Sequence, residues 1–295
     1  MELLVNFVCP DCHGVLKEIA VGLECSVCGE VYPQNSAGKV DFRLRKSKRV
    51  GMSWVVNDAF PAGIGASFFM NPNLPKPAVD FKPFPAPRHF TPQLLTLFPK
   101  ASSPTSKMLD IGCGDGIHKS LGEYAGFQYF GLDYNDPDAP FWGDAHALPF
   151  MDQSFDLVIA MAVFQQVRFP MVAMQEVQRV LKPGGVFLGT VSFLEPFHGN
   201  GFYHYTILGI ENLLTAAGLK INYLAPVQHW SALEAQAHMG LFPKMPVFLA
   251  GLMVLPTLWL HKLWWKIGAR FNLKATEKMR AVTLAGSFQF AAEKL

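Results

Sequence analysis

The chain has 295 residues, of which half are apolar and 16% are charged, and its formal net charge is +2. Soluble domains average about 25% charged residues, so the sequence leaves an excess of apolar surface to be explained. The small net charge does not indicate a globally basic, nucleic-acid-binding protein. The first ten residues lack a basic stretch followed by an apolar core, so we expect no secretory signal and a reducing, cytoplasmic setting for the five cysteines.

Two Cys-x-x-Cys pairs near the N-terminus comprise Cys9, Cys12, Cys25 and Cys28. Four thiolates in this arrangement suit tetrahedral zinc, and a closed four-thiolate site holds a structural ion. Gly14 and Gly29 follow the two pairs closely, as tight turns around a metal require. We therefore predict a zinc ribbon over residues 1–42, with two redox-active cysteine pairs as the alternative.

Residues 43–104 begin with a basic run from Arg43 to Arg49 and are then rich in proline. Repeated prolines exclude long helices and central strands. We predict a Pro-rich linker with one short helix around residues 92–98 that docks on the following domain. The basic run is interpreted as a solvated linker, with contact to anionic lipid or RNA phosphate left open because the run is short.

Residues 105–225 alternate between strand and helix patterns. We expect strands over 107–111, 127–132, 155–160, 186–191 and 219–224, and helices over 116–125, 170–181 and 206–218. The second helix should stop at the Lys-Pro-Gly-Gly sequence of residues 182–185, and the third should begin at Thr206 and end at Gly218. Strands separated by helices of this length predict a parallel, doubly wound sheet.

A glycine-rich turn follows the first of these strands. Gly112, Gly114 and Gly116 let the backbone turn tightly and let a ligand approach it, and the next helix offers free N–H groups. The second strand ends at Asp133, which could accept hydrogen bonds from ribose hydroxyls. Asp144 follows and could accept from an adenine amino group. A glycine-rich turn alone is typical of several nucleotide-binding folds, but this order of acids favours a nucleoside cofactor.

Four segments carry a family resemblance: LDIGCGDG at 109–116, GLDYND at 131–136, GDAHALPFMDQSFDLVIA at 143–160 and LKPGG at 181–185. They resemble class I, Rossmann-like S-adenosylmethionine-dependent methyltransferases that act mostly on small molecules and lipids. The resemblance covers residues 105–225. It implies a three-layer α/β/α sandwich with a seven-stranded, mostly parallel sheet, in which residues 285–293 resemble the antiparallel last strand.

The resemblance also implies a cofactor site. The glycine-rich loop would hold the methionine part of S-adenosylmethionine, with Asp110 as a supporting acid, and Met161 would face the sulfonium. Asp133 corresponds to the ribose-binding acid, and Tyr134 would lie against the adenine. The complete expected set is Asp110, Gly112, Gly114, Asp115, Gly116, His118, Asp133, Tyr134, Asp144, Ala145 and Met161.

The sequence departs from the family pattern where a catalytic histidine often stands. Relatives often have Leu-Glu-His-Val after the fourth strand, whereas residues 164–167 here are Phe-Gln-Gln-Val. His198 and His204 follow the fifth strand, where substrate-facing loops emerge. We expect one of them to act in catalysis; the alternative is that both only pack or form hydrogen bonds in a loop.

Residues 226–280 form an apolar insert that we expect to be helical and close to the substrate entrance. Its uncharged stretch, 245–260, is shorter than the about 20 residues of a membrane span, and we expect Pro246 and Pro256 to interrupt it. Tryptophans and lysines that follow suit a bilayer interface. The interpretations are a monotopic cap dipping into the membrane, a lid or dimer interface, and, least favoured, a transmembrane span.

These observations predict a methyltransferase domain over residues 105–295 that transfers a methyl group from S-adenosylmethionine to an O, N or C nucleophile. We favour a hydrophobic or lipid-linked small-molecule acceptor, with peripheral contact between a cytoplasmic protein and a membrane. One alternative is a zinc-ribbon RNA base methyltransferase, which the low net charge disfavours. Another is a non-catalytic binding protein with the same fold. The acceptor and the oligomeric state are left open.

Overall fold

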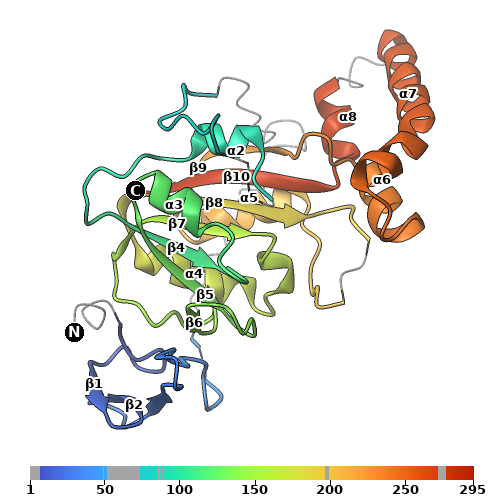
Figure 1. The fold of residues 1–295 in the computed structure, drawn as a ribbon. Helices are drawn as coiled ribbons and strands as arrows, with labels where there is room; N and C mark the ends of the chain where they lie inside the picture. The colour runs from blue at the N-terminus through green and yellow to red at the C-terminus, as the bar shows by residue number, and fades with distance from the viewer. Residues whose placement is uncertain are drawn as a thin grey trace.

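The computed structural model describes residues 7–48, 50–51, 74–84, 87, 89–196, 199–271 and 277–295. Three parts follow one another across the molecule in Figure 1. A small antiparallel sheet lies at one end, a large sheet with helices on both faces occupies the middle, and a group of helices lies at the other end.

The large sheet has seven strands in the order β6-β5-β4-β7-β8-β10-β9. Only β10 runs antiparallel to its neighbours, and it pairs with both β8 and β9. The predicted fold, including the antiparallel last strand, is confirmed. The bounds are β4 (Lys107–Ile111), β5 (Gln128–Asp133), β6 (Phe141–Trp142), β7 (Phe155–Met161), β8 (Leu181–Ser192), β9 (Leu219–Pro226) and β10 (Ser287–Lys294).

Alternating side chains of the central strands supply two separate cores, which is why the sheet needs a helical layer on each face. Met108 of β4 packs in a cluster with Leu94 and Leu121, from α2 (Pro92–Leu97) and α3 (Lys119–Tyr124). Leu109 packs in the other cluster with residues of α4 (Pro170–Val180) and α5 (Ile207–Ala216). The three-layer arrangement follows directly from this alternation.

The predicted helix boundaries are close to the observed ones. The Thr206 side chain accepts a hydrogen bond from the Gly209 N–H at 3.0 Å, which caps α5. Gly218 has a φ of +82° after the same helix. The Thr91 side chain caps α2 in the same way, and a second hydrogen bond joins it to Gln289 of β10. The short helix expected around residues 92–98 therefore docks on the large sheet.

The small sheet comprises β1 (Leu16–Ile19), β2 (Gly22–Cys25) and β3 (Val31–Pro33). It is joined to the edge of the large sheet at β6. Asp41 forms a parallel bridge with Trp142, and the Phe42 N–H donates to the Trp142 carbonyl at 2.7 Å. Phe7 packs on Phe141, with ring centroids 5.0 Å apart. The two sheets thus share backbone hydrogen bonds and an aromatic core.

The insert contains α6 (Ala232–Ala235), the π-helical η3 (Gln236–Leu241), α7 (Val247–Phe271) and α8 (Glu277–Thr283). Our expectation that Pro256 interrupts the apolar stretch is wrong, because α7 runs through it for 25 residues. Proline removes the partner of the Leu252 carbonyl, and Leu252 is exposed, so solvent can satisfy that carbonyl. Among the described residues, α7 is long and apolar enough to cross a membrane by length and composition.

Candidate cofactor cleft and metal centre

A cleft of about 2600 Å³ opens at the carboxyl ends of the parallel strands. Its wall includes residues that follow β4, β5, β7 and β8, and it continues to Trp230, His238 and Val247 of the insert. Ligands of open α/β sheets bind at this edge, because the strand-to-helix loops converge there. The cleft therefore joins the predicted cofactor loops to the foot of α7.

The glycine-rich loop after β4 forms one wall. Gly112, Gly114 and Gly116 all have positive φ angles, of +68°, +53° and +81°. A side chain at Gly112 would come within 2.5 Å of Val163, so only glycine fits without displacing it. Gly112, Gly114 and Asp115 line the cleft, whereas Gly116 does not.

Asp110 lies behind this loop and is fully buried. Its Oδ2 accepts from the Tyr129 hydroxyl at 2.9 Å and lies 3.0 Å from Nδ1 of His118, which lines the cleft. Burial raises the pKa of Asp110, and the His118 contact opposes that rise. The other oxygen, Oδ1, is buried and has no hydrogen-bond partner among the described residues. Such an oxygen is suited to a donor from a bound group.

Asp133 and Tyr134 lie where β5 ends. The Asp133 carboxylate accepts hydrogen bonds from the N–H groups of Gly114 at 3.1 Å, Asn135 at 2.9 Å and Asp136 at 3.0 Å. Two carboxylate oxygens offer about four acceptor positions, so Asp133, which lines the cleft, can accept a further hydrogen bond. Tyr134 is 52% exposed beside it. The loop thus fixes an acid in position to receive hydroxyl donors.

Asp144 and Ala145 line the cleft after β6, together with His146. His146 Nε2 accepts from the Phe169 N–H at 3.0 Å, so Nδ1 carries the ring proton and donates it to Asp144. Burial alone would raise the pKa of Asp144, but the hydrogen bonds from His146 hold it below its usual range. Met161, at the end of β7, is buried and also lines the cleft.

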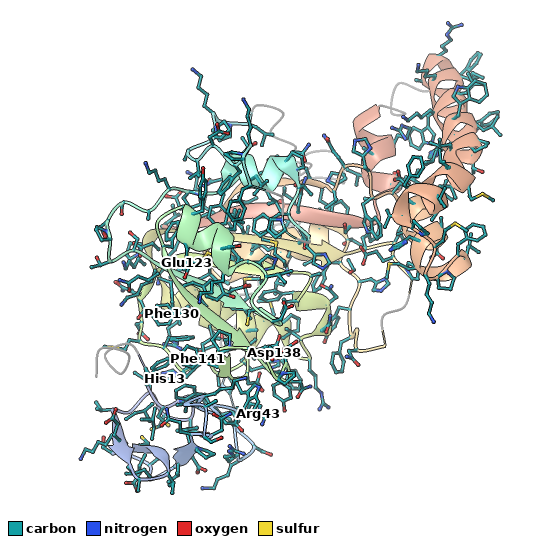
Figure 2. All side chains as sticks on the ribbon, in the orientation of Figure 1. His13, Arg43, Glu123, Phe130, Asp138 and Phe141 are labelled. Carbon is teal, nitrogen blue, oxygen red and sulfur yellow. The ribbon has the colours of Figure 1, made fainter. Side chains whose placement is uncertain are left out.

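Arg43 brings the N-terminal part into contact with this end of the cleft, which sequence reasoning missed. Its guanidinium pairs with Asp41 at 2.8 Å and donates to the Tyr134 carbonyl at 3.3 Å. It also lies over the Trp142 ring, 5.3 Å from the centroid. Figure 2 shows Arg43 near Phe141, where the small and large parts meet. An isolated basic run contains no signal for such a contact, because it depends on tertiary packing.

Of the two predicted catalytic histidines, the structure describes His204, which does not line the cleft. His204 is exposed, and His198 lies outside the described residues. The structure instead brings Glu195 and His238 to the wall. Glu195 follows the carboxyl end of β8, a position from which the strand-end rule could have selected it. His238 comes from η3, and nothing in the sequence pattern places that element over the cleft.

Glu195, Gln165 and His238 in the wall of the cleft differ in their hydrogen bonding. Glu195 accepts from the Ser192 hydroxyl and the Trp230 indole N–H, both at 2.5 Å. Buried Gln165 donates through Nε2 to the Ala162 carbonyl at 2.8 Å, while its Oε1 has no partner in the described chain. The Nδ1 atom of His238 is buried and likewise has no hydrogen-bond partner there. The wall of the cleft therefore combines a fixed carboxylate with two residues that each carry a polar atom without a partner in the described chain.

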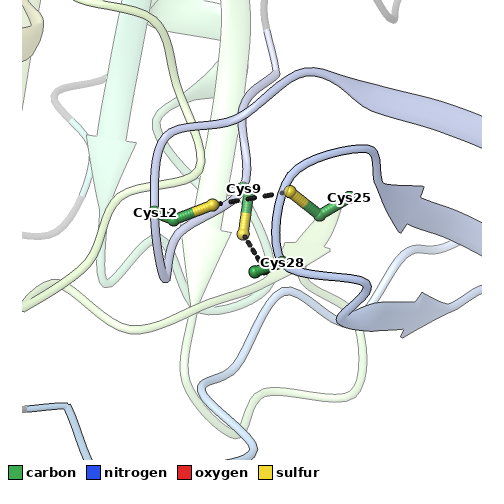
Figure 3. Close-up of side chains that lie close together, drawn as sticks. All are labelled: Cys9, Cys12, Cys25 and Cys28. Carbon is green, nitrogen blue, oxygen red and sulfur yellow. Dashed lines mark hydrogen bonds between the residues drawn. The ribbon is translucent and has the colours of Figure 1, made fainter.

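The four N-terminal cysteines come together at one point, as Figure 3 shows. All four sulfur atoms lie within 4.8 Å of one another. Two of the separations are 3.6 Å between the Cys9 and Cys28 sulfurs and 3.5 Å between the Cys12 and Cys25 sulfurs. Tetrahedral zinc with Zn–S bonds of about 2.3 Å would space its sulfurs by about 3.8 Å. The thiol set therefore fits a structural zinc ion.

The turns around this centre differ in part from expectation. Gly29, directly after the second pair, has a φ of +73°, but after the first pair it is His13 that has a positive φ, of +58°. Gly14 instead lets the backbone pass close to the cysteine centre, because a side chain there would come within 2.9 Å of the Cys25 sulfur. Burial opposes ionisation of Cys25, but N–H groups of Cys28 and Val27 outweigh it and lower its pKa to about 7.

Residues 109–189 match the family model described as a methyltransferase domain. The chain is 35% identical over 107 residues to a demethylmenaquinone methyltransferase of Renibacterium salmoninarum, covering 32% of this chain and 45% of that protein. It is 30% identical over 145 residues to a malonyl-[acyl-carrier protein] O-methyltransferase of Erwinia billingiae, covering 45% and 52%. The chain thus spans about half the length of these relatives.

Among solved structures, the chain is similar to an S-adenosylmethionine-dependent methyltransferase from Mesorhizobium loti. The identity is 15%, the TM-score is 0.43, and the match covers 69% of this chain and 96% of that one. The matched family model spans β4 to the middle of β8, which carry the glycine-rich loop and the acids of the cleft. Residues 109–189 of this chain therefore match a methyltransferase domain, and the seven-stranded sheet around them has the fold expected from the sequence.

Proposed function

We propose that the protein transfers a methyl group from S-adenosylmethionine to a hydrophobic or lipid-linked small molecule at a membrane surface. The supporting observation is the continuity of one cleft from the glycine-rich loop to Val247 at the foot of the apolar helix α7. The similar proteins named above act on demethylmenaquinone and on a malonyl-[acyl-carrier protein], neither of which is a nucleic acid.

The cofactor site in this proposal consists of the predicted residues that line the cleft, with Asp110 and Gly116 behind them. Asp133 would hold the ribose hydroxyls, and Asp144 with Ala145 would contact the adenine edge. The cofactor supplies a methyl group on a sulfonium, which is already a good leaving group. The protein then contributes mainly alignment and exclusion of water.

On the acceptor side, we propose His238 as the group that removes a proton when the acceptor is a hydroxyl. His238 lines the cleft, its Nδ1 has no hydrogen-bond partner among the described residues, and its ring packs against Trp230 with centroids 6.0 Å apart. Glu195 orients Trp230 through the indole N–H. His198 stays a second candidate for this role.

Replacement of His238 by asparagine is expected to lower the rate of methyl transfer about 100-fold, because a positioned general base contributes at least that much. The affinity for S-adenosylmethionine should stay unchanged. His229→Asn is a matched control, since His229 is an exposed residue of the same cleft wall. Equal rates for both variants, measured by transfer of labelled methyl to lipid extract, would remove His238 from the mechanism.

Arg43 should support the adenine end of the cleft. Arg43→Ala is expected to weaken S-adenosylmethionine binding severalfold, because loss of one exposed charged contact of this kind is worth about 1 kcal/mol. Arg45→Ala is the control: Arg45 also pairs with Asp41, at 2.9 Å, but among the described residues it is Arg43 that reaches Tyr134 and Trp142. Calorimetric titration of both variants checks this, and equal affinities would contradict it.

The two remaining elements of the proposal are the metal and the division of the chain. We propose structural zinc on Cys9, Cys12, Cys25 and Cys28, a ribbon over residues 1–42, a linker over 43–104 and a methyltransferase domain over 105–295.

The experiment that tests the proposed activity is titration of zinc-loaded protein with S-adenosylmethionine by calorimetry. Saturable binding supports the proposal, and its absence in folded, zinc-loaded protein refutes it.

A further inference from the structure

The helix α7 leaves most of its apolar surface uncovered. Only Ala250 and Val254 are buried along its 25 residues. Exposed apolar residues occur over its whole length and include Phe248, Leu252, Met253, Leu255, Trp259, Leu260, Leu263, Trp264, Ile267 and Phe271. Contiguous apolar surface of this extent marks a contact with a partner or a membrane.

Two stripes with helical spacing organise the second half of α7. Leu260, Leu263, Trp264, Ile267 and Phe271 are three or four residues apart and therefore form one exposed apolar face. The basic residues Lys262, Lys266 and Arg270 repeat every four residues and form a second stripe along the flank of the first. All three basic residues are exposed.

This combination fits a bilayer with anionic headgroups better than a protein surface. Residues 247–271 contain no acidic side chain, so nothing within the helix neutralises the positive charge of the basic stripe. Basic side chains beside an apolar face are typical of helices that lie in the membrane interface, with tryptophans at headgroup depth. The charges at every fourth residue also make the second half unfavourable for burial in hydrocarbon.

We propose that α7 lies in the plane of an anionic membrane, with its apolar face in the acyl region and Lys262, Lys266 and Arg270 on lipid phosphates. This orientation keeps β10, which follows the insert, on the same side of the membrane as the rest of the large sheet. It also places the cleft, through Val247, at the membrane surface. The link to acceptor entry rests on the proposed methyltransferase function, whereas membrane binding itself does not.

The test is flotation of the full-length, zinc-loaded protein with phosphatidylcholine vesicles that contain or lack phosphatidylglycerol. Each basic residue near an anionic surface raises partitioning about fivefold. The triple variant Lys262→Gln, Lys266→Gln, Arg270→Gln should therefore bind anionic vesicles about a hundredfold more weakly. The control triple, Lys17→Gln, Lys100→Gln, Lys220→Gln, removes the same charge from exposed positions elsewhere.

A second variant separates the apolar contribution. Trp264→Gln with Phe271→Gln changes two side chains that are 73% and 87% exposed, so folding should be unaffected and binding to both vesicle types should fall. Salt should weaken binding of the wild type to anionic vesicles, because exposed charges are screened.

Several results would overturn the proposal. They are equal binding by the α7 triple and the control triple, no binding of wild type to anionic vesicles, association resistant to alkaline carbonate as for a spanning helix, or dimerisation in place of vesicle binding. Calorimetric binding of S-adenosylmethionine in the same preparations separates these results from failure of the proposed function.

Discussion

Removal of the metal from the four-cysteine centre is expected to unfold the N-terminal part of the protein. A three-stranded sheet of this size buries too little apolar surface to be stable alone. In small zinc modules the apparent free energy of zinc binding, about 10–16 kcal/mol, is also the free energy that stabilises the fold. Loss of that much folding free energy should separate Phe7 from Phe141 and Phe150 and Phe42 from Phe141. It should also free Arg43 from Tyr134. A lower-temperature unfolding transition should appear.

The measurement is calorimetric unfolding before and after treatment with a chelator, with metal content determined on the same samples. Cys25→Ser should reproduce the effect of the chelator, because it removes one of the four ligands. Cys113→Ser should keep the zinc, since Cys113 lies in the glycine-rich loop outside the cysteine centre. An unchanged unfolding profile after complete metal removal would contradict the structural role.

Asp133→Ala is expected to weaken S-adenosylmethionine binding about 1000-fold. One hydrogen bond from a ribose hydroxyl to the remaining acceptor position of the carboxylate is worth about 2 kcal/mol. The variant also leaves the N–H groups of Gly114, Asn135 and Asp136 without their acceptor, and the resulting loss of loop geometry costs about as much again. Calorimetric titration measures the change.

The control for this prediction is Asp80→Ala, which removes an exposed acid that does not line the cleft. Its affinity for S-adenosylmethionine should equal that of the wild type. Circular dichroism and unfolding profiles of both variants establish that they are folded. An affinity of Asp133→Ala within a fewfold of the wild type would exclude Asp133 as the ribose acceptor.

Much of the fold could be predicted because local patterns and tertiary structure agree there. The helices over residues 170–180 and 207–216 carry their start and stop signals in the sequence, and the central strands are short apolar runs between them. Strand β6 was missed because two residues cannot show a periodic pattern. The path of α7 through Pro256 was missed because proline usually ends a helix, whereas here the affected turn is exposed.

The cleft was predictable to the extent that it depends on strand ends. The glycine-rich loop, Asp133 and Asp144 follow consecutive strands, so the fold rule brings them to one edge. Arg43 and His238 could not be found in this way, since the first reaches the cleft through the docking of the small sheet and the second through the insert. Such contacts depend on packing between distant parts of the chain.

The central claim is that this cleft carries methyl transfer from S-adenosylmethionine to a hydrophobic acceptor. The most direct test is incubation of zinc-loaded protein with S-adenosylmethionine labelled in the methyl group, a membrane extract and total RNA, followed by extraction into organic solvent. We predict label in the organic phase with wild-type protein and none with Asp133→Ala. Label that stays with RNA, or no transfer to the extract by protein that binds the cofactor, would contradict the proposed acceptor class.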